Sequence, residues 1–405
     1  MYTVPSTGHP LKSHVVGGDG SIASVAAVPF GAAARRTLGA MEFDWTPEQR
    51  ALRAEAAEVA RDAVARFGRS NDSWINGFSK EFAAELAGRG WIGLTWPAEF
   101  GGGGRPPIDR LIIGEELIVA GAPIAAMWFA DRQMGPSLIK YGRPDQQDAF
   151  LPGILSGETT WCIGMSEPNA GSDLASLATT ADDGGDHWVI NGQKIWTSFG
   201  EVADYCYLIC RTAKDGPPHR GISEIIVPMT APGIEVRPIK DMTTNRHFCE
   251  VFFTDVRVPK ENLVGVEGNA FKQTMAQLEH ERGGIDRLVS NQALFELARA
   301  RADTTDPLVR DEIAAIHSTY VIGRVLVARE VLRQAPAGFS AATKCLCTEH
   351  EQRVSEFVFR TLGPAATLWD EVTRGLCYAP GYTIMGGTSN VMRNILAERV
   401  LGLPR

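Results

Sequence analysis

The sequence predicts an α+β protein with an N-terminal helical domain, a central β-barrel or β-sandwich domain, and a C-terminal four-helix bundle. Apolar residues recur at helical spacing up to about residue 157, short β-rich runs fill 158–265, and helical spacing returns after that. At 405 residues the chain is also too long for one hydrophobic core. The predicted domains are 41–157, 158–265 and 266–405.

The bulk composition excludes several classes of function. A formal net charge of −8 gives no basic surface for nucleic acid or anionic lipid. No apolar run approaches the roughly 18 residues of a membrane span. The seven cysteines form no CxxC pair typical of zinc, so we expect small core residues in a reducing cytoplasm.

Residues 1–40 predict a disordered extension. They are rich in Gly, Ala, Ser and Val and show no sustained periodicity. No hydrophobic stretch follows Arg35-Arg36, which disfavours a twin-arginine export signal. We interpret this segment as the product of translation that begins upstream of Met41. A transit peptide is the less favoured alternative.

Three helix starts organise the N-terminal domain. Thr46-Pro47 places a capping residue before proline at the first helical position. Ser79 precedes a second helix that carries Phe82 and Leu86, and Asp109 opens a third. The glycines at 101–104 separate the second helix from the third.

The central domain contains short strands bounded by Gly, Pro and Asp. Runs at 161–165 and 188–196 flank a small-residue loop, and Asn191-Gly192 within the second run predicts a hairpin. Four further strands are expected at 205–210, 222–227, 234–238 and 248–253.

Helical segments near 269–301, 307–335, 341–363 and 388–400 predict the bundle. Asp306-Pro307 marks one helix start, and Gly363-Pro364 marks one stop.

The loop MSEPNAGSD at 165–173 cannot be helical through Pro168 and Gly171. It offers free backbone N–H groups and hydroxyls to a ligand rich in acceptors. Taken alone, the same composition fits a turn-rich surface loop equally well.

Several ordered motifs resemble those of the acyl-CoA dehydrogenase family. MSEPNAGSD followed by NGQKIWTS is similar to the paired signature with which that family holds FAD against a small β-domain. GWIGLTWPAEFGG at 90–102, YGRPDQQDAFLPGILSGE at 141–158 and IMGGTSNVMRNILAERVLGLPR at 384–405 extend the resemblance from about Phe43 to Arg405. The chain is identified as a member of this family.

The resemblance implies cofactor and substrate contacts at matching positions. It places Ser172 near the pantetheine of the substrate or near the cofactor, and it implies a structural role for Glu167-Pro168. The implied FAD contacts are Ile163, Met165, Ser166, Trp196, Thr197, Ser198, Gly387, Thr388, Ser389 and Asn390.

Glu281 is the candidate catalytic base. It falls on the apolar stripe of Leu278, Ile285 and Leu288, and Arg282 falls on a neighbouring stripe. Burial raises the pKa of a glutamate, which suits proton abstraction next to a carbonyl, although a buried Glu–Arg structural pair is the alternative.

The rest of that helix predicts a solvated face. Glu279 and His280 align with a set of polar positions. These positions are Lys272, Gln273, Asp286 and Arg287.

The resemblance supports the same assignment. Most members carry a catalytic glutamate immediately before the Gly-Thr of the C-terminal motif, where this chain has Gly386. The isovaleryl-CoA and long-chain branches instead place the base one residue before an arginine, as Glu281 stands before Arg282. Arg282 is accordingly a substrate-binding candidate.

The implied reaction is FAD-dependent α,β-dehydrogenation of an acyl thioester. Glu281 would take the α-proton, flavin would accept the β-hydride, and the backbone N–H of Gly386 would bind the thioester oxygen. Electrons would pass to an electron-transfer flavoprotein. Alternatives are an acyl-ACP dehydrogenase, an acyl-CoA oxidase or flavin monooxygenase, and a non-catalytic subunit of a heteromer.

The resemblance implies a homotetramer. However, 298–314 lacks the Arg-x-x-Phe-Gly-like segment that reaches the FAD of a neighbouring subunit in many members. A heteromer is therefore the alternative assembly.

Overall fold

The computed structural model describes residues 14–16, 22–24, 45–282, 284–368 and 371–404, and the chain divides into the units Met1–Thr46 and Pro47–Arg405. In the first unit, β1 (His14–Val16) pairs antiparallel with β2 (Ile22–Ser24). The rest of the predicted N-terminal extension lies outside the described residues.

The second unit begins with helices, as predicted. α1 starts at Pro47, and α3 is capped by Ser79, whose hydroxyl accepts the N–H of Phe82 at 3.1 Å. α4 begins at Pro107, two residues before the predicted start, because proline suits the first helical position. The helices are α1 (Pro47–Phe67), α2 (Ser73–Asn76), α3 (Lys80–Gly88), α4 (Pro107–Ala120), α5 (Ala125–Phe129), α6 (Gly135–Tyr141) and α7 (Pro144–Leu155). A π-helical turn at Ala130–Met134 joins α5 to α6.

The central domain is one open sheet, not the closed barrel or two-sheet sandwich that the strand count predicted. Its order is β10-β7-β6-β4-β5-β9-β8, and β3 also pairs with β6, in parallel. The strands are β3 (Trp161–Gly164), β4 (Thr180–Asp183), β5 (His187–Ser198), β6 (Tyr205–Arg211), β7 (Ile222–Pro228), β8 (Ile234–Ile239), β9 (Phe248–Pro259) and β10 (Leu263–Val264).

The hairpin predicted at Asn191-Gly192 is wrong, because β5 runs through both residues. The register with β9 shifts between Ile190 and Gly192. Asn191 accepts the Asp255 N–H at 2.9 Å, and its amide donates to the Asp255 carboxylate at 3.1 Å. The Asn-Gly pair therefore forms a β-bulge instead of a turn.

The C-terminal domain is helical, which confirms the overall class. The helices are α8 (Ala270–Arg282), α9 (Asp286–Val289), α10 (Gln292–Arg299), α11 (Pro307–Val331), α12 (Ser340–Leu362), α13 (Glu371–Tyr382) and α14 (Ser389–Ile395). The predicted single helix at 269–301 is three helices, and Gly284, a poor helix former, lies between the first two of them. α13 was not predicted.

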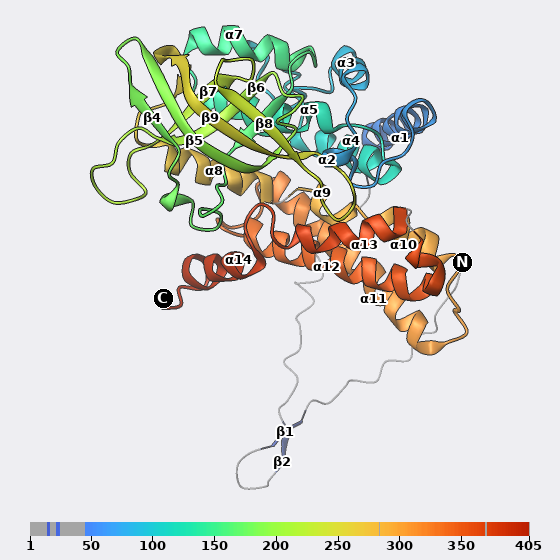
Figure 1. Ribbon diagram of the computed structural model, residues 1–405. Coiled ribbons are helices and arrows are strands. Elements are labelled where there is room, and N and C mark those ends of the chain that lie inside the picture. The colour runs from blue at the N-terminus through green and yellow to red at the C-terminus, as the bar shows by residue number, and fades with distance from the viewer. Residues whose placement is uncertain (1–13, 17–21, 25–44, 283, 369–370, 405) are drawn as a thin grey trace, which may run out of the picture. The chain divides into compact units, whose positions relative to one another are not determined.

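α12 is the central helix of this domain. It packs against α8, α9, α10, α11, α13 and α14. α8 also contacts strand β7, while α9 contacts α4, so these first C-terminal helices lie against both the sheet and the N-terminal helices (Figure 1). Within the described residues, no helix is both long and apolar enough to cross a membrane.

Candidate functional site

A buried ion pair holds the loop after β3 against β5. The Nζ of Lys194 donates to Glu167 at 2.8 Å and to the carbonyl of Met165 at 3.0 Å. Glu167 also accepts the N–H groups of Ala178 and Thr179. Burial disfavours ionisation of Glu167, but Lys194 together with the hydrogen bonds from Ala178 and Thr179 lowers the pKa of the carboxyl. Glu167 is therefore structural, as predicted.

The end of β5 presents an exposed indole and an unsatisfied hydroxyl. Trp196 has φ +61° and is 55% exposed, which is unusual for a large aromatic residue. Its backbone lies in the register shift between Lys194 and Thr197. Thr197 is 1% exposed, and its Oγ1 has no partner among the described residues. This combination is typical of a ligand site.

The segment before α14 forms a tight glycine turn. Gly386 and Gly387 have φ of +67° and +101°, which L side chains rarely adopt. The Gly387 carbonyl accepts from the buried Nζ of Lys344 at 2.6 Å. Thr388 then caps α14 by accepting the N–H of Val391 at 3.2 Å, and the Oγ of Ser389 is buried without a partner among the described residues.

A chain of side-chain contacts connects these two segments. The ring of Trp196 lies 5.8 Å from that of Phe248, and His247 lies 4.0 Å from Phe248. The ring of His247 is 5.8 Å from Tyr378, whose hydroxyl contacts the sulfur of Met385 at 3.7 Å. The β5 end and the turn at Gly386 therefore belong to one region of the fold.

The remaining candidate residues lie on several different elements. Ile163 is in β3, opposite Tyr207 of β6, and the carbonyl of Ser166 accepts the N–H of Ile195 at 2.9 Å. Ser198 is partly exposed at the end of β5, and Ser172 is exposed on the loop after β3. Asn390 is exposed in the first turn of α14.

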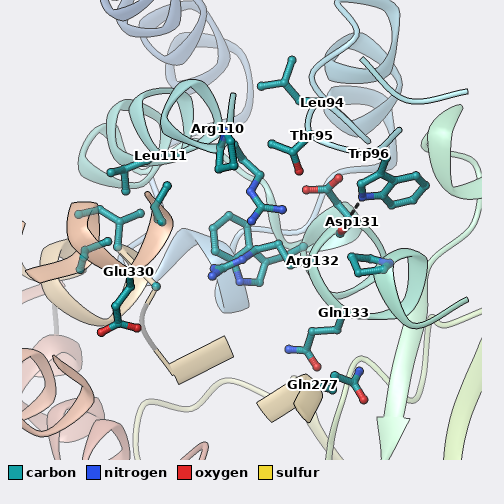
Figure 2. Close-up of a pocket in the computed structure, with 18 of the residues that line it drawn as sticks. Leu94, Thr95, Trp96, Arg110, Leu111, Asp131, Arg132, Gln133, Gln277 and Glu330 are labelled. Atoms are coloured by element: carbon teal, nitrogen blue, oxygen red, sulfur yellow. Dashed lines mark hydrogen bonds between the residues drawn. The ribbon is translucent and has the colours of Figure 1, made fainter. Parts of the chain in front are cut away.

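A cavity of about 570 Å³ lies between the N-terminal helices and the first C-terminal helices. Its walls come from α4, from residues 91–97, from the π-helical turn, from α8 and from the α11–α12 connection (Figure 2). Many lining side chains are apolar, including Trp96, Leu111, Met127 and Trp128. The volume suits a ligand of drug-like size.

Positions 281 and 282 belong to α8, but the side chains of Glu281 and Arg282 lie outside the described part of the structure. Their neighbours along the chain do line the cavity: Gln277 precedes position 281 by one helical turn, and Gly284 and Ile285 follow it. The candidate base therefore stands on a segment that borders the cavity.

The predicted solvated face of this segment is wrong in part. Gln273 is 4% exposed and Asp286 is 1% exposed. Gln273 donates to Glu224 at 2.9 Å, and Asp286 accepts from Arg132 at 2.6 Å. Arg287, also buried, lies 5.0 Å from the ring of Trp74. Gln273 and Asp286 can be buried because partners on the sheet and in the N-terminal domain satisfy them.

The sequence analysis missed two polar groups of the cavity wall, Arg110 of α4 and Asp131 of the π-helical turn. Burial lowers the pKa of the Arg110 guanidinium, while the charge of Asp131 opposes that shift. Burial also raises the pKa of the Asp131 carboxyl, which accepts the N–H of Gly93 at 2.7 Å. For Arg110, the pattern that could have revealed it is a charge at a helical position surrounded by Ile and Leu.

Comparison with known proteins decides the family. Three family models match in order: the acyl-CoA dehydrogenase N-terminal domain at 46–158, the middle domain at 162–256 and the C-terminal domain at 268–401. The acyl-CoA dehydrogenase IpdE1 of Mycobacterium tuberculosis is 39% identical over 335 residues, which are 79% of this chain and 86% of that protein. The chain belongs to the acyl-CoA dehydrogenase family. It is therefore an oxidoreductase that acts on CH–CH bonds.

Two solved structures are also similar. The "Tcur3481-Tcur3483 steroid ACAD" has a TM-score of 0.82 at 31% identity, over 90% of this chain and 100% of that chain. The ChsE4-ChsE5 complex from Mycobacterium tuberculosis has a TM-score of 0.79 at 33% identity, again over 90% and 100%. The first is described as a steroid enzyme, and the second as a complex.

Proposed function

We propose that this enzyme uses bound FAD to dehydrogenate an acyl-CoA thioester between its α and β carbons, with Glu281 as the base. The observation that carries the proposal is the cavity, whose wall includes Gln277, Gly284 and Ile285 on either side of position 281. In this proposal the carboxylate acts within a largely apolar space, where a raised pKa would favour proton abstraction.

The residues present fit FAD at the end of β5. An unpaired buried Oγ1 on Thr197 and an exposed, left-handed Trp196 offer a hydrogen-bonding group and an aromatic surface side by side. The Oγ of Ser389, which has no partner within the described residues, and the glycines at 386 and 387 offer a second set of possible cofactor contacts. We assign Met165, Ser166, Ser198, Gly387, Thr388 and Asn390 to the same cofactor site. When bound, FAD would accept the β-hydrogen with its electron pair.

The chain's own residues would handle the proton and the developing charge. Glu281 takes the α-proton, and the electron pair of the broken C–H bond becomes the new C=C bond as the β-hydrogen leaves. The backbone N–H of Gly386 donates to the thioester oxygen, where negative charge develops. The product is a trans-2-enoyl thioester. We assign Arg282 and Ser172 to substrate binding.

The relatives favour a bulky acyl group and a multi-subunit assembly. A cavity of about 570 Å³ suits a polycyclic acyl chain of the kind that a steroid enzyme accepts. On α11, Val321, Ile322 and Val325 are each about half exposed, and such side chains favour burial against another subunit. We propose a tetramer of this chain, or a heteromer with a related one, that passes electrons to an electron-transfer flavoprotein.

The test is an absorbance spectrum of the purified protein, followed by anaerobic titration with thioesters. The panel contains straight-chain, branched and polycyclic acyl-CoAs, together with an acyl-ACP. We expect a bound flavin that bleaches with a bulky acyl-CoA and forms little hydrogen peroxide in air. A protein that binds no flavin would instead be a non-catalytic subunit, and rapid peroxide formation would indicate an oxidase.

A further inference from the structure

Arg110 places a guanidinium in the wall of the cavity, where no residue of the described part of the chain pairs with it directly. It extends from α4 toward the cavity (Figure 2). Among the described residues it forms no hydrogen bond or ion pair, whereas the neighbouring Arg132 donates to Asp286 at 2.6 Å. A guanidinium has five N–H donors, and leaving them unpaired beside apolar side chains is unfavourable. This arrangement indicates an acceptor supplied by a ligand.

Gln277 provides a second, independent observation. It comes from α8, is 8% exposed, and both Nε2 and Oε1 lack a partner within the described residues. It lines the same cavity as Arg110. Since most buried amide groups are satisfied, two unpaired polar groups in one cavity point to a ligand with more than one polar atom.

The charges around Arg110 favour a neutral acceptor over an anion. Asp131 and Arg132 lie in the same wall, and their charges act on Arg110 in opposite directions. Arg132 is already paired with Asp286 at 2.6 Å, whereas the charge of Asp131 stabilises the charged form of Arg110. A ligand carboxylate would bring a second negative charge close to Asp131, at a cost in repulsion. A ketone or hydroxyl oxygen would use the free N–H donors of Arg110 without that repulsion.

We propose that Arg110 is a specificity-determining residue that donates hydrogen bonds to a neutral oxygen, a ketone or hydroxyl, on the acyl group away from its thioester. This inference rests on the proposed function, because it takes the cavity as the acyl site. Gln277 stands one turn before position 281, so its amide faces the part of the acyl group near the reacting carbons. Arg110 comes from a different element and contacts the remote part.

The experiment measures dissociation constants by calorimetry for trans-2-enoyl-CoA products, which bind without turnover. The FAD-loaded enzyme is titrated with an unsubstituted chain, with chains carrying an oxo group at successive carbons beyond the β carbon, and with the matching ω-carboxylate. We expect at least one oxo compound to bind about tenfold more tightly than the unsubstituted chain, the scale of a charge-assisted hydrogen bond. Equal dissociation constants across the series would overturn the inference.

Two variants separate the roles of charge and hydrogen bonding. Arg110→Met should abolish the oxo preference while leaving flavin content and binding of the unsubstituted chain intact. Asp131→Asn keeps an oxygen that accepts the Gly93 N–H but removes the negative charge. The affinity for the carboxylate compound should therefore rise relative to the affinity for the oxo compound. Tighter binding of the carboxylate than of every oxo compound by the unmodified enzyme would contradict a neutral ligand.

The outcomes also separate this inference from the proposed function. Tight binding and flavin bleaching with no oxygen preference would overturn the role of Arg110 alone. If no thioester binds, both fail. If Arg110→Met does not fold, the product series with the unmodified enzyme and with Asp131→Asn still decides the question.

Discussion

Two buried side chains of β5 differ in how their polar groups are satisfied. Lys194 is fully buried, yet it is paired with Glu167 and the carbonyl of Met165. Thr197 is equally buried, and its Oγ1 has no partner among the described residues. A buried unpaired hydroxyl is unfavourable in the protein alone. We interpret Thr197 as a group whose partner arrives with the cofactor.

Replacing Thr197 by valine should therefore have opposite effects on stability and on cofactor binding. Removing an unpaired buried hydroxyl should leave the free energy of unfolding of the flavin-free protein unchanged or raised. The dissociation constant for FAD should rise about three- to tenfold, as expected for one hydrogen bond. Urea unfolding of the apoprotein and fluorescence titration with FAD measure the two quantities.

Thr179→Val is the matched control. Thr179 is also 1% exposed, but its hydroxyl already donates to the carbonyl of Gln193 at 3.3 Å. This variant should lower apoprotein stability by about 1 kcal/mol and leave FAD affinity unchanged. The same pattern in both variants would contradict a cofactor role for Thr197.

For individual residues, the sequence predicted the roles of those that lie within recognisable motifs and missed the roles of the others. Glu167 was assigned a structural role, and its ion pair with Lys194 confirms that role. Arg110 and Gln277 escaped notice because each is significant only through the absence of a partner. Partners depend on tertiary packing, which periodicity along one helix does not reveal.

Strand β5 depends on one residue without a side chain. Gly192 has φ +148°, and a Cβ at this position would lie 2.5 Å from Thr179 Oγ1 and 2.6 Å from Thr179 Cα. Since a backbone atom at that distance must move, the close approach of Thr179, the residue before β4, to β5 requires glycine. The bulge that begins here sets the register of Gln193 and Lys194 with β9, and a second shift follows before Thr197.

Gly192→Ala should destabilise the protein by roughly 1–3 kcal/mol through overpacking, and it should also reduce flavin retention. Thermal unfolding and the ratio of flavin to protein absorbance measure these effects. Gly171→Ala is a suitable control, because a Cβ there meets no atom within 4 Å. Equal effects of the two substitutions would show that the contact with Thr179 is unimportant.

Most elements were predictable, and the errors have local causes. Caps at Ser79 and Asp306 located helix starts because their side chains do accept backbone N–H groups. Asn191-Gly192 suits a turn and a bulge equally, and only pairing with β9 selects the bulge. α13 was missed because it contains Pro380 and Gly375, which weaken a helical pattern that packing against α12 restores.

Buried acids lie where the N-terminal helices meet the C-terminal domain. Asp72 is 3% exposed, and Glu351 of α12 is fully buried. Burial raises the pKa of Asp72 to about 7. Burial also raises the pKa of Glu351 well above its ordinary value, and the charge of Asp72 adds to that shift. Both groups therefore favour the protonated form in the folded protein.

These shifts predict that stability falls as pH rises from about 4 to about 7. Over that window the unfolded chain has released the Asp72 proton, whose ordinary pKa is 3.8, while the folded chain still holds it. The loss is about 1.4 kcal/mol per unit of pKa difference. Asp72→Asn should reduce the loss of stability with rising pH, because it removes the ionisable group. Asparagine is a suitable replacement because it also tolerates the left-handed φ of +52° found there.

Urea unfolding at several pH values between 4 and 8 measures this dependence. The exposed Asp311→Asn of α11 is the control and should leave it unchanged. If the unmodified protein and Asp72→Asn show the same pH dependence, Asp72 does not ionise in the way its burial requires.

The order of helical, sheet and helical domains was predictable for the whole molecule, because hydrophobic periodicity changes at each transition. The open form of the sheet was not predictable. Short strands with similar spacing fit barrels, sandwiches and open sheets alike, and the parallel pairing of β3 with β6 joins segments far apart in the sequence.

The central claim is that a carboxylate at position 281 removes the α-proton. The most direct measurement is the rate of anaerobic flavin bleaching by a matched acyl-CoA, compared between the unmodified enzyme and Glu281→Gln. We predict that the variant retains flavin and binds the enoyl product normally, but bleaches at least about a hundredfold more slowly, as expected for loss of a general base. Bleaching at a near-normal rate would contradict the claim.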